Sequence, residues 1–71
     1  MTDSKALRCW IAKKGLKLKA IASAIGITPY CLKKKIDNES EFKASEISVF
    51  VDVFHMTQED RDAIFFASDV D

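Results

Sequence analysis

Four residues, Gly26-Ile27-Thr28-Pro29, limit what this chain can fold into more than any other segment. Glycine ends a helix readily, because it adopts the left-handed backbone conformation without a steric penalty. Thr28 is a residue type that caps the start of a helix, and proline is well suited to the first helical position that follows. The sequence therefore predicts that one helix ends near residue 25 and that a second begins at residue 29.

Apolar residues recur at the spacing of one helix face on both sides of this turn: Leu18, Ile21, Ala22 and Ile25 before it, and Leu32 and Ile36 after it. We therefore predict helices over about 17–25 and 29–36. The small side chain of Ala22 allows a close approach, and Ile27 fills the angle between the helices. Residues 17–36 are predicted to form a helix-turn-helix, a motif of two helices joined by a short glycine-containing turn.

Three further helices are predicted at about residues 4–14, 46–54 and 58–67. Asp3 or Ser4 is expected to cap the first, Ser45 the next and Thr57 the last. No segment shows the sustained two-residue alternation of a strand. The predicted fold is all-α: a compact bundle of four to five helices that forms a single domain over residues 1–71, with acidic helices over 45–67.

The length and composition set broad limits on the class of protein. The chain has 71 residues, of which 48% are hydrophobic and 31% charged, an ordinary mixture for one globular domain. No apolar run approaches the roughly 20 residues that a membrane span needs. The first residues lack the basic-then-apolar layout of a signal peptide. We therefore expect no membrane partner and a cytoplasmic location.

A net charge of zero conceals a strong asymmetry between the two halves. Residues 1–36 contain nine basic residues and one acidic residue, whereas residues 37–71 contain two basic and ten acidic residues. Such an asymmetry favours an anionic partner for the first half. The alternative interpretation is a solvated charged face, with attraction between the two halves.

Catalysis and metal binding find little support in the residue types present. Cys9 and Cys31 are interpreted as reduced, half-buried core residues. Two distant cysteines and the lone His55 do not provide the ligands of a metal site. The chain has no serine–histidine–aspartate set and no glycine-rich phosphate loop. We therefore predict that the protein is not an enzyme and that it uses no metal or cofactor.

A resemblance rests on two groups of residues: Gly15-Leu16, Ile21-Ala22, Ile25-Gly26-Ile27-Thr28 and Leu32, and then residues 32–38, Ser40-Glu41-Phe42 and Ser45-Glu46-Ile47. The first group resembles the Cro/repressor-type (lambda-repressor-like, Xre) helix-turn-helix family, and the second resembles small phage regulators within it. The resemblance covers about residues 5–67. It implies a Cro-like transcription regulator of a bacteriophage or prophage genetic switch, acting in the bacterial host cell on double-stranded operator DNA.

The same resemblance implies that the start of the third predicted helix contacts bases and that the start of the second binds phosphate. The positions carried over are Lys17, Leu18, Lys19, Thr28, Pro29, Tyr30, Lys33 and Lys34. Lys33 and Lys34 suit phosphates or guanine acceptors, whereas proline has no side-chain hydrogen bond with which to specify a base.

Three departures from the family pattern favour a different partner. Lys17 replaces a capping serine, Leu18 a polar residue facing DNA, and Asp37 an asparagine able to donate to phosphate. The negative charge of Asp37 is expected to repel phosphate. These changes support a second hypothesis, an antirepressor or modulator that binds a phage repressor protein rather than DNA. Large apolar residues expected at a protein interface are Trp10, Leu18, Tyr30 and one of Phe65 and Phe66, and core packing is the alternative for each. A homodimer through the fifth helix and a monomer are both consistent with the sequence.

Overall fold

The computed structural model describes residues 1–66, and over this range the chain is all-α. Its five helices are α1 (Ser4–Lys14), α2 (Leu18–Ile25), α3 (Pro29–Ile36), α4 (Ala44–Asp52) and α5 (Gln58–Phe65). No strand is present in this range. The predicted bounds of α1 and α3 are confirmed, and α2 begins one residue later than expected. The last helix, expected over 58–67, ends at residue 65, and Phe66 is its C-cap. Residue 67 lies outside the described residues.

The start of α1 and the ends of α1 and α2 have the causes that the sequence indicates. An oxygen of Asp3 accepts a hydrogen bond from the N–H of Ala6 at 3.0 Å, and thereby caps α1. Gly15 and Gly26 follow α1 and α2 with φ of +68° and +92°. A side chain is strained in this left-handed conformation, so glycine allows both helices to end sharply.

The start of α4 differs from the prediction. Ser45 does not cap this helix but lies within its first turn, and the N-cap is Lys43. Glu46 is the reason, because its Oε1 accepts the N–H of Lys43 at 2.8 Å. This side chain satisfies the N–H of the N-cap residue itself, whereas a capping Ser45 would have accepted an amide of the first turn after it. The helix consequently begins earlier, at residue 44, and it ends at residue 52 rather than 54.

The core lies where α1, α4 and α5 meet, and Phe50 of α4 is at its centre. Phe50 is fully buried and makes edge-on or tilted contacts with Trp10, Phe42 and Phe65, at ring-centroid distances of 5.9, 5.8 and 5.2 Å. Leu7, Ile21, Leu32 and Ile36 are also fully buried and extend the core towards α2 and α3. One continuous core therefore joins all five helices.

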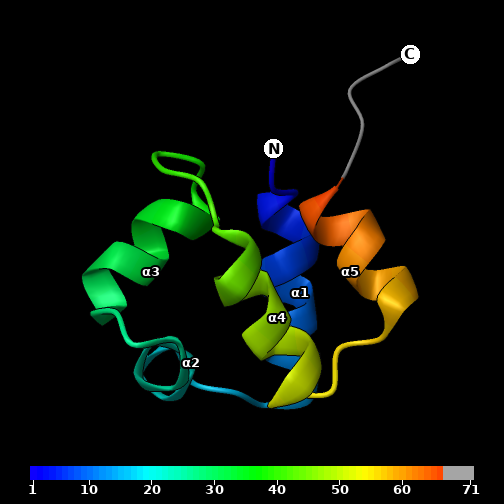
Figure 1. Ribbon diagram of the computed structural model, residues 1–71, viewed down its shortest axis with the longest axis horizontal. Helices are drawn as coiled ribbons and strands as arrows, with labels where there is room; N and C mark the ends of the chain where they lie inside the picture. Colours follow the sequence, from blue (N-terminus) through cyan, green and yellow to red (C-terminus); the bar gives the residue numbers. More distant parts are fainter. Residues whose placement is uncertain (67–71) are drawn as a thin grey trace.

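The order of the helices across the molecule separates the charges. Figure 1 shows α2 and α3 on one side and α5 on the other, with α1 and α4 between them; α2 is seen nearly end-on and crosses α3 steeply. Lys17, Lys19 and the run Lys33–Lys35 lie on the first side, where residues 17–36 include no acidic residue. In α5, three acidic residues accompany Arg61. The asymmetry seen along the sequence is therefore also an asymmetry in space.

Within residues 1–66, no helix combines the length and the apolar character needed to cross a membrane.

Candidate functional site

The outer face of α3 is the most exposed of the predicted binding regions. Thr28 precedes the helix, and its hydroxyl accepts the N–H of Cys31 at 3.1 Å, which satisfies a free amide of the first turn. Leu32 and Ile36 are fully buried and hold α3 against the rest of the molecule. The helical period then turns the side chains of Tyr30 and Lys34 away from the core.

Tyr30 and Lys34 form a pair one helical turn apart. The Tyr30 side chain is 70% exposed, the largest exposure of a big apolar residue after Met1. The ammonium group of Lys34 lies 5.4 Å from the centroid of the Tyr30 ring, within the range of a cation–π contact. This pair presents a flat aromatic surface next to a positive charge, and Lys33 adds a second, exposed cation beside it.

The start of α2 adds two more cations and free amides. Lys17 is the N-cap of α2, and its side chain makes no capping hydrogen bond. The side chains of Lys17 and Lys19 are both exposed. First-turn amides without a capping side chain attract anions, since they carry the positive end of the helix dipole. This arrangement can contribute to binding a phosphate group or a carboxylate.

We expected Leu18 to be exposed, but the structure shows that it is partly buried. Its side chain is only half-exposed and packs against the core cluster. The replacement of a polar residue by leucine at this position is therefore a packing feature of α2. We call the remaining predicted residues the α2–α3 face, namely Lys17, Lys19, Thr28, Pro29, Tyr30, Lys33 and Lys34.

The two cysteines are a further correction. Both Cys9 and Cys31 are exposed rather than half-buried, and both are free thiols. In α3 the helical period places Cys31 beside Tyr30, because Leu32 and Ile36 occupy the buried stripe. The small apolar character of cysteine misled the sequence interpretation, since it does not distinguish a core position from an exposed one.

Lys35, the last of the three consecutive lysines, is not part of this face. Its ammonium group lies 3.1 Å from Oε1 of Glu46, and both side chains are about nine-tenths buried. It also donates to the backbone carbonyl of Glu41 at 3.0 Å. Lys35 therefore ties α3 to the start of α4.

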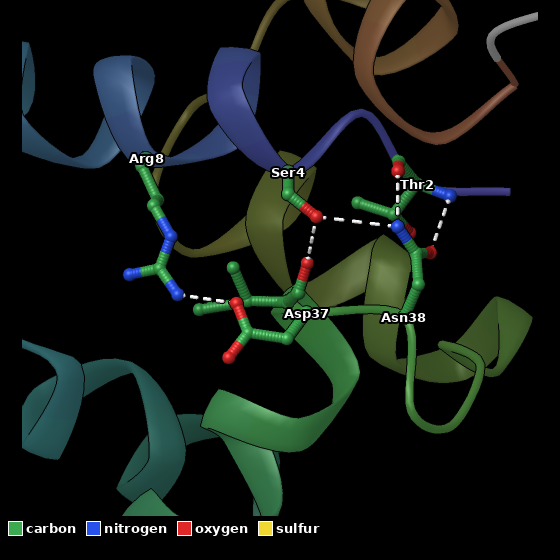
Figure 2. Close-up of polar contacts among 6 residues, drawn as sticks. Thr2, Ser4, Arg8, Asp37 and Asn38 are labelled. Atoms are coloured by element: carbon green, nitrogen blue, oxygen red, sulfur yellow. Dashed lines mark hydrogen bonds and ion pairs between the residues drawn. The ribbon is translucent and has the colours of Figure 1, made fainter.

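Asp37, which was expected to repel phosphate, has an opposite charge beside it. The guanidinium group of Arg8 on α1 forms an ion pair with the Asp37 carboxylate just after α3 (Figure 2). Both side chains remain partly exposed, at 48% and 30%. The ion pair offsets the negative charge at the end of α3, so that the repulsion inferred from the sequence is weakened.

Asn38 joins the first residues of the chain to the end of α3. Its amide accepts the N–H of Thr2 at 3.0 Å and donates to the carbonyl of Thr2 at 2.8 Å. Ser4 completes the arrangement, because its hydroxyl donates to the carbonyl of Ile36 (Figure 2). Asn38 itself has φ of +64°, a left-handed conformation that asparagine tolerates better than most residues. We call Thr2, Ser4 and Asn38 the N-terminal clamp.

The apolar residues expected at a protein interface divide into two groups. Trp10 is 6% and Phe65 5% exposed, so the expectation that Trp10 lies at the surface is wrong. Trp10 is buried because it packs edge-on against Phe50. Its indole N–H finds no acceptor within residues 1–66. Phe66, in contrast, is 58% exposed. Of the Phe65–Phe66 pair, the second is therefore the exposed one.

Sequence reasoning missed the ion pair of Arg8 and the clamp formed by Asn38. Both contacts join residues about 30 positions apart, so no local spacing indicates them. The available signals were weak: an arginine on a predicted helix flank, and an asparagine after a helix.

No group of three or more histidine, cysteine or acidic side chains within residues 1–66 is arranged to hold a metal ion. Comparisons with models of known protein families, with curated proteins and with solved structures found no match to this chain.

Proposed function

We propose that this protein is a helix-turn-helix transcription regulator of a phage-type genetic switch, and that its α2–α3 face binds operator DNA within a bacterial host cell. The observation that carries the proposal is the concentration of exposed cations on two adjacent helices whose segment, residues 17–36, includes no acidic residue. Neutralisation of phosphates by lysine provides much of the affinity of a protein for DNA.

The geometry of α2 and α3 supports a helix-turn-helix. The two helices are eight residues each, cross steeply and are joined by residues 26–28 (Figure 1). Ile21, Ala22, Leu32 and Ile36 are buried, which favours a fixed angle between the helices. In such a motif the start of the second helix contacts base edges in the major groove. Here that start carries Thr28, Pro29 and Tyr30.

The charges near α3 add support for DNA as the ligand. The ion pair with Arg8 offsets the charge of Asp37, one of the three departures from the family pattern. Leu18 is partly buried against the core, whereas the neighbouring Lys17 and Lys19 are exposed. Four exposed or half-exposed lysines therefore remain on the α2–α3 face.

The proposal is tested by titrating the full chain against labelled duplex DNA over a range of salt concentrations. In the Lys33→Ala/Lys34→Ala double variant, we expect the slope of log affinity against log salt to fall by about 2, since each phosphate contact contributes about one. The matched control is Lys5→Ala/Lys13→Ala, which removes two exposed lysines from α1. Equal losses in both double variants, or no binding by the wild type at low salt, would overturn the proposal.

A second candidate function is an antirepressor or modulator that binds a repressor protein, and the exposure of Tyr30 favours it. A tyrosine that is 70% exposed beside Pro29 is typical of an interface anchor, whereas neither residue offers the paired hydrogen bonds that identify a base. We expect Tyr30→Ala to weaken a repressor complex by more than tenfold. Lys33→Ala/Lys34→Ala should mainly slow association. Surface-immobilised repressor from a related switch provides the measurement.

The homodimer through α5 remains a prediction. It would match the two half-sites of a palindromic operator, and sedimentation of the protein with and without duplex DNA tests it.

A further inference from the structure

An apolar groove lies between α4 and α5, away from the α2–α3 face. Its apolar lining comes from Phe42, Ile47, Val51 and Phe66, and its volume is about 450 Å³. A smaller hollow of about 120 Å³ adjoins it and shares Phe42, Ile47 and Phe66. Phe66 is 58% exposed where the two meet. Together they are large enough to take two or three apolar side chains of another molecule.

The groove and the adjoining hollow are lined by two acidic side chains and one basic side chain. Asp52 lines the groove and Glu41 lines the adjoining hollow, and neither is in an ion pair within residues 1–66. Arg61 is the cation in the lining, and it is already engaged. Its guanidinium lies 2.9 Å from Asp62 and 5.7 Å from the centroid of the Phe66 ring. The groove therefore combines an apolar lining with acidic groups that lack a cationic partner.

This pattern of charge disfavours both occupants that the chain itself could supply. In a two-fold dimer across the groove, Asp52 and Glu41 would face an equally acidic surface. Residues 67–71 follow Phe66 directly, but their sequence, Ala-Ser-Asp-Val-Asp, brings two more negative charges. Like charges brought together at an interface weaken binding.

We propose that the α4–α5 groove binds a basic, amphipathic helical segment of a partner protein, with apolar side chains against Phe66 and cations beside Asp52 and Glu41. The proposal is independent of the function assigned to the α2–α3 face, because the lining of the groove includes no residue of that face. The helices α2 and α3 lie on one side of the molecule and α5 on the other, with α4 between them (Figure 1). The protein would then bind two partners at once. The α2–α3 face would bind DNA or a repressor protein, and the α4–α5 groove would bind a basic segment of another protein.

A pair of synthetic helical peptides tests the proposal by fluorescence anisotropy with the full chain. Both peptides carry leucine at helical spacing along one face, and the remaining positions are lysine in one and glutamate in the other. We expect the lysine peptide to bind at least tenfold more tightly than the glutamate peptide. Raising the salt concentration should weaken binding without abolishing it, because the apolar contacts do not depend on salt.

Variants then locate the binding. Phe66→Ser should lower the affinity about tenfold or more, as expected for an aromatic anchor. Asp52→Lys should lower it as well, since it reverses a charge without touching the apolar lining. Tyr30→Ser is the matched control, because it removes another exposed aromatic ring from the opposite side, and it should leave the affinity unchanged. All three positions are exposed, so circular dichroism should show an unchanged helical content.

Four outcomes would overturn the proposal. Equal binding of the two peptides would mean that charge plays no part, and an unaltered affinity in Phe66→Ser would place the peptide elsewhere. If the free protein sediments as a dimer and Phe66→Ser makes it a monomer, the occupant is a second copy. If Val70→Ser in the full chain strengthens peptide binding, the occupant is the segment 67–71. None of these results bears on DNA binding by the α2–α3 face.

Discussion

The α2–α3 side and the α4–α5 side of this molecule each expose an aromatic ring, but the charged residues near the two rings are of opposite sign. On the first, apolar side chains face inwards and the exposed groups are lysines around the single aromatic ring of Tyr30. On the second, Asp52 and Glu41 line a groove and its adjoining hollow, in which Phe66 remains exposed. A chain with no net charge can thus offer two surfaces that suit oppositely charged partners. The comparison also raises a physical question, which is how strongly the two sides depend on one another.

The shared core provides the largest expected effect. We predict that Phe50→Ala lowers the free energy of unfolding by about 3–5 kcal/mol, because a fully buried ring in contact with α1 and α5 is lost. Urea unfolding followed by circular dichroism measures it, with the exposed Val53→Ala as the control. Hydrogen exchange should show that α3 and α5 lose protection together. If only α5 does so, the two sides are separate cooperative units.

We expect the loss of the N-terminal clamp to have the next largest effect on the free energy of unfolding. Asn38→Ala removes two hydrogen bonds to Thr2 and places alanine at φ of +64°, so we expect a loss of about 2–3 kcal/mol in unfolding free energy. Asn38→Gly keeps the backbone conformation and should lose only about 1 kcal/mol. His55→Gly is the control, since His55 has a similar φ of +62°. Thermal unfolding that finds equal losses in the two Asn38 variants would show that backbone strain plays no part.

The ion pair between Lys35 and Glu46 joins the two sides directly. Glu46→Gln keeps an oxygen to accept the N–H of Lys43 but removes the charge, and we expect a loss of about 1–2 kcal/mol. Because both side chains are about nine-tenths buried, salt should screen the pair poorly. Unfolding in 0.1 M and 1 M sodium chloride therefore should give nearly the same difference. A difference that vanishes at high salt would contradict the buried arrangement.

The smallest effect is expected for Arg8 and Asp37. Their side chains are 48% and 30% exposed, so a double-mutant cycle with alanine should give a coupling free energy below about 1 kcal/mol. The functional effect should be clearer than the effect on stability. Arg8→Ala leaves the Asp37 charge without its partner and should weaken DNA binding, and the further change Asp37→Ala should restore it. Weakening that persists in the double variant would mean that Arg8 contacts DNA itself.

Much of the fold could be predicted from the sequence because its determinants are local. Gly26, Thr28 and Pro29 act on their immediate neighbours, and they define the end of α2 and the start of α3 correctly. The predicted start of α4 was wrong because two possible local contacts compete there. Glu46 reaches back to Lys43 and overrides the capping preference of Ser45, the residue that we expected to cap this helix.

The candidate site was less predictable, because exposure depends on tertiary packing. Tyr30, Lys33 and Phe66 are exposed as expected, whereas Trp10 and Leu18 are wholly or partly buried. Helical periodicity places a residue on a flank, but it does not indicate which neighbouring helix covers that flank. The partner of Asp37 was inaccessible to sequence reasoning, since Arg8 lies 29 positions away.

The N-terminal clamp also has a consequence for the order of folding. Thr2 and Asn38 are 36 positions apart, so a long loop must close before they can form hydrogen bonds. Closing this loop costs conformational entropy, which the hydrogen bonds offset only once they have formed. We expect helices and their nearest contacts to form earlier, and the clamp to form after the rate-limiting step. Breaking it should accelerate unfolding and leave the refolding rate nearly unchanged. The first residues of the chain would therefore set the lifetime of the folded state rather than the speed at which it is reached.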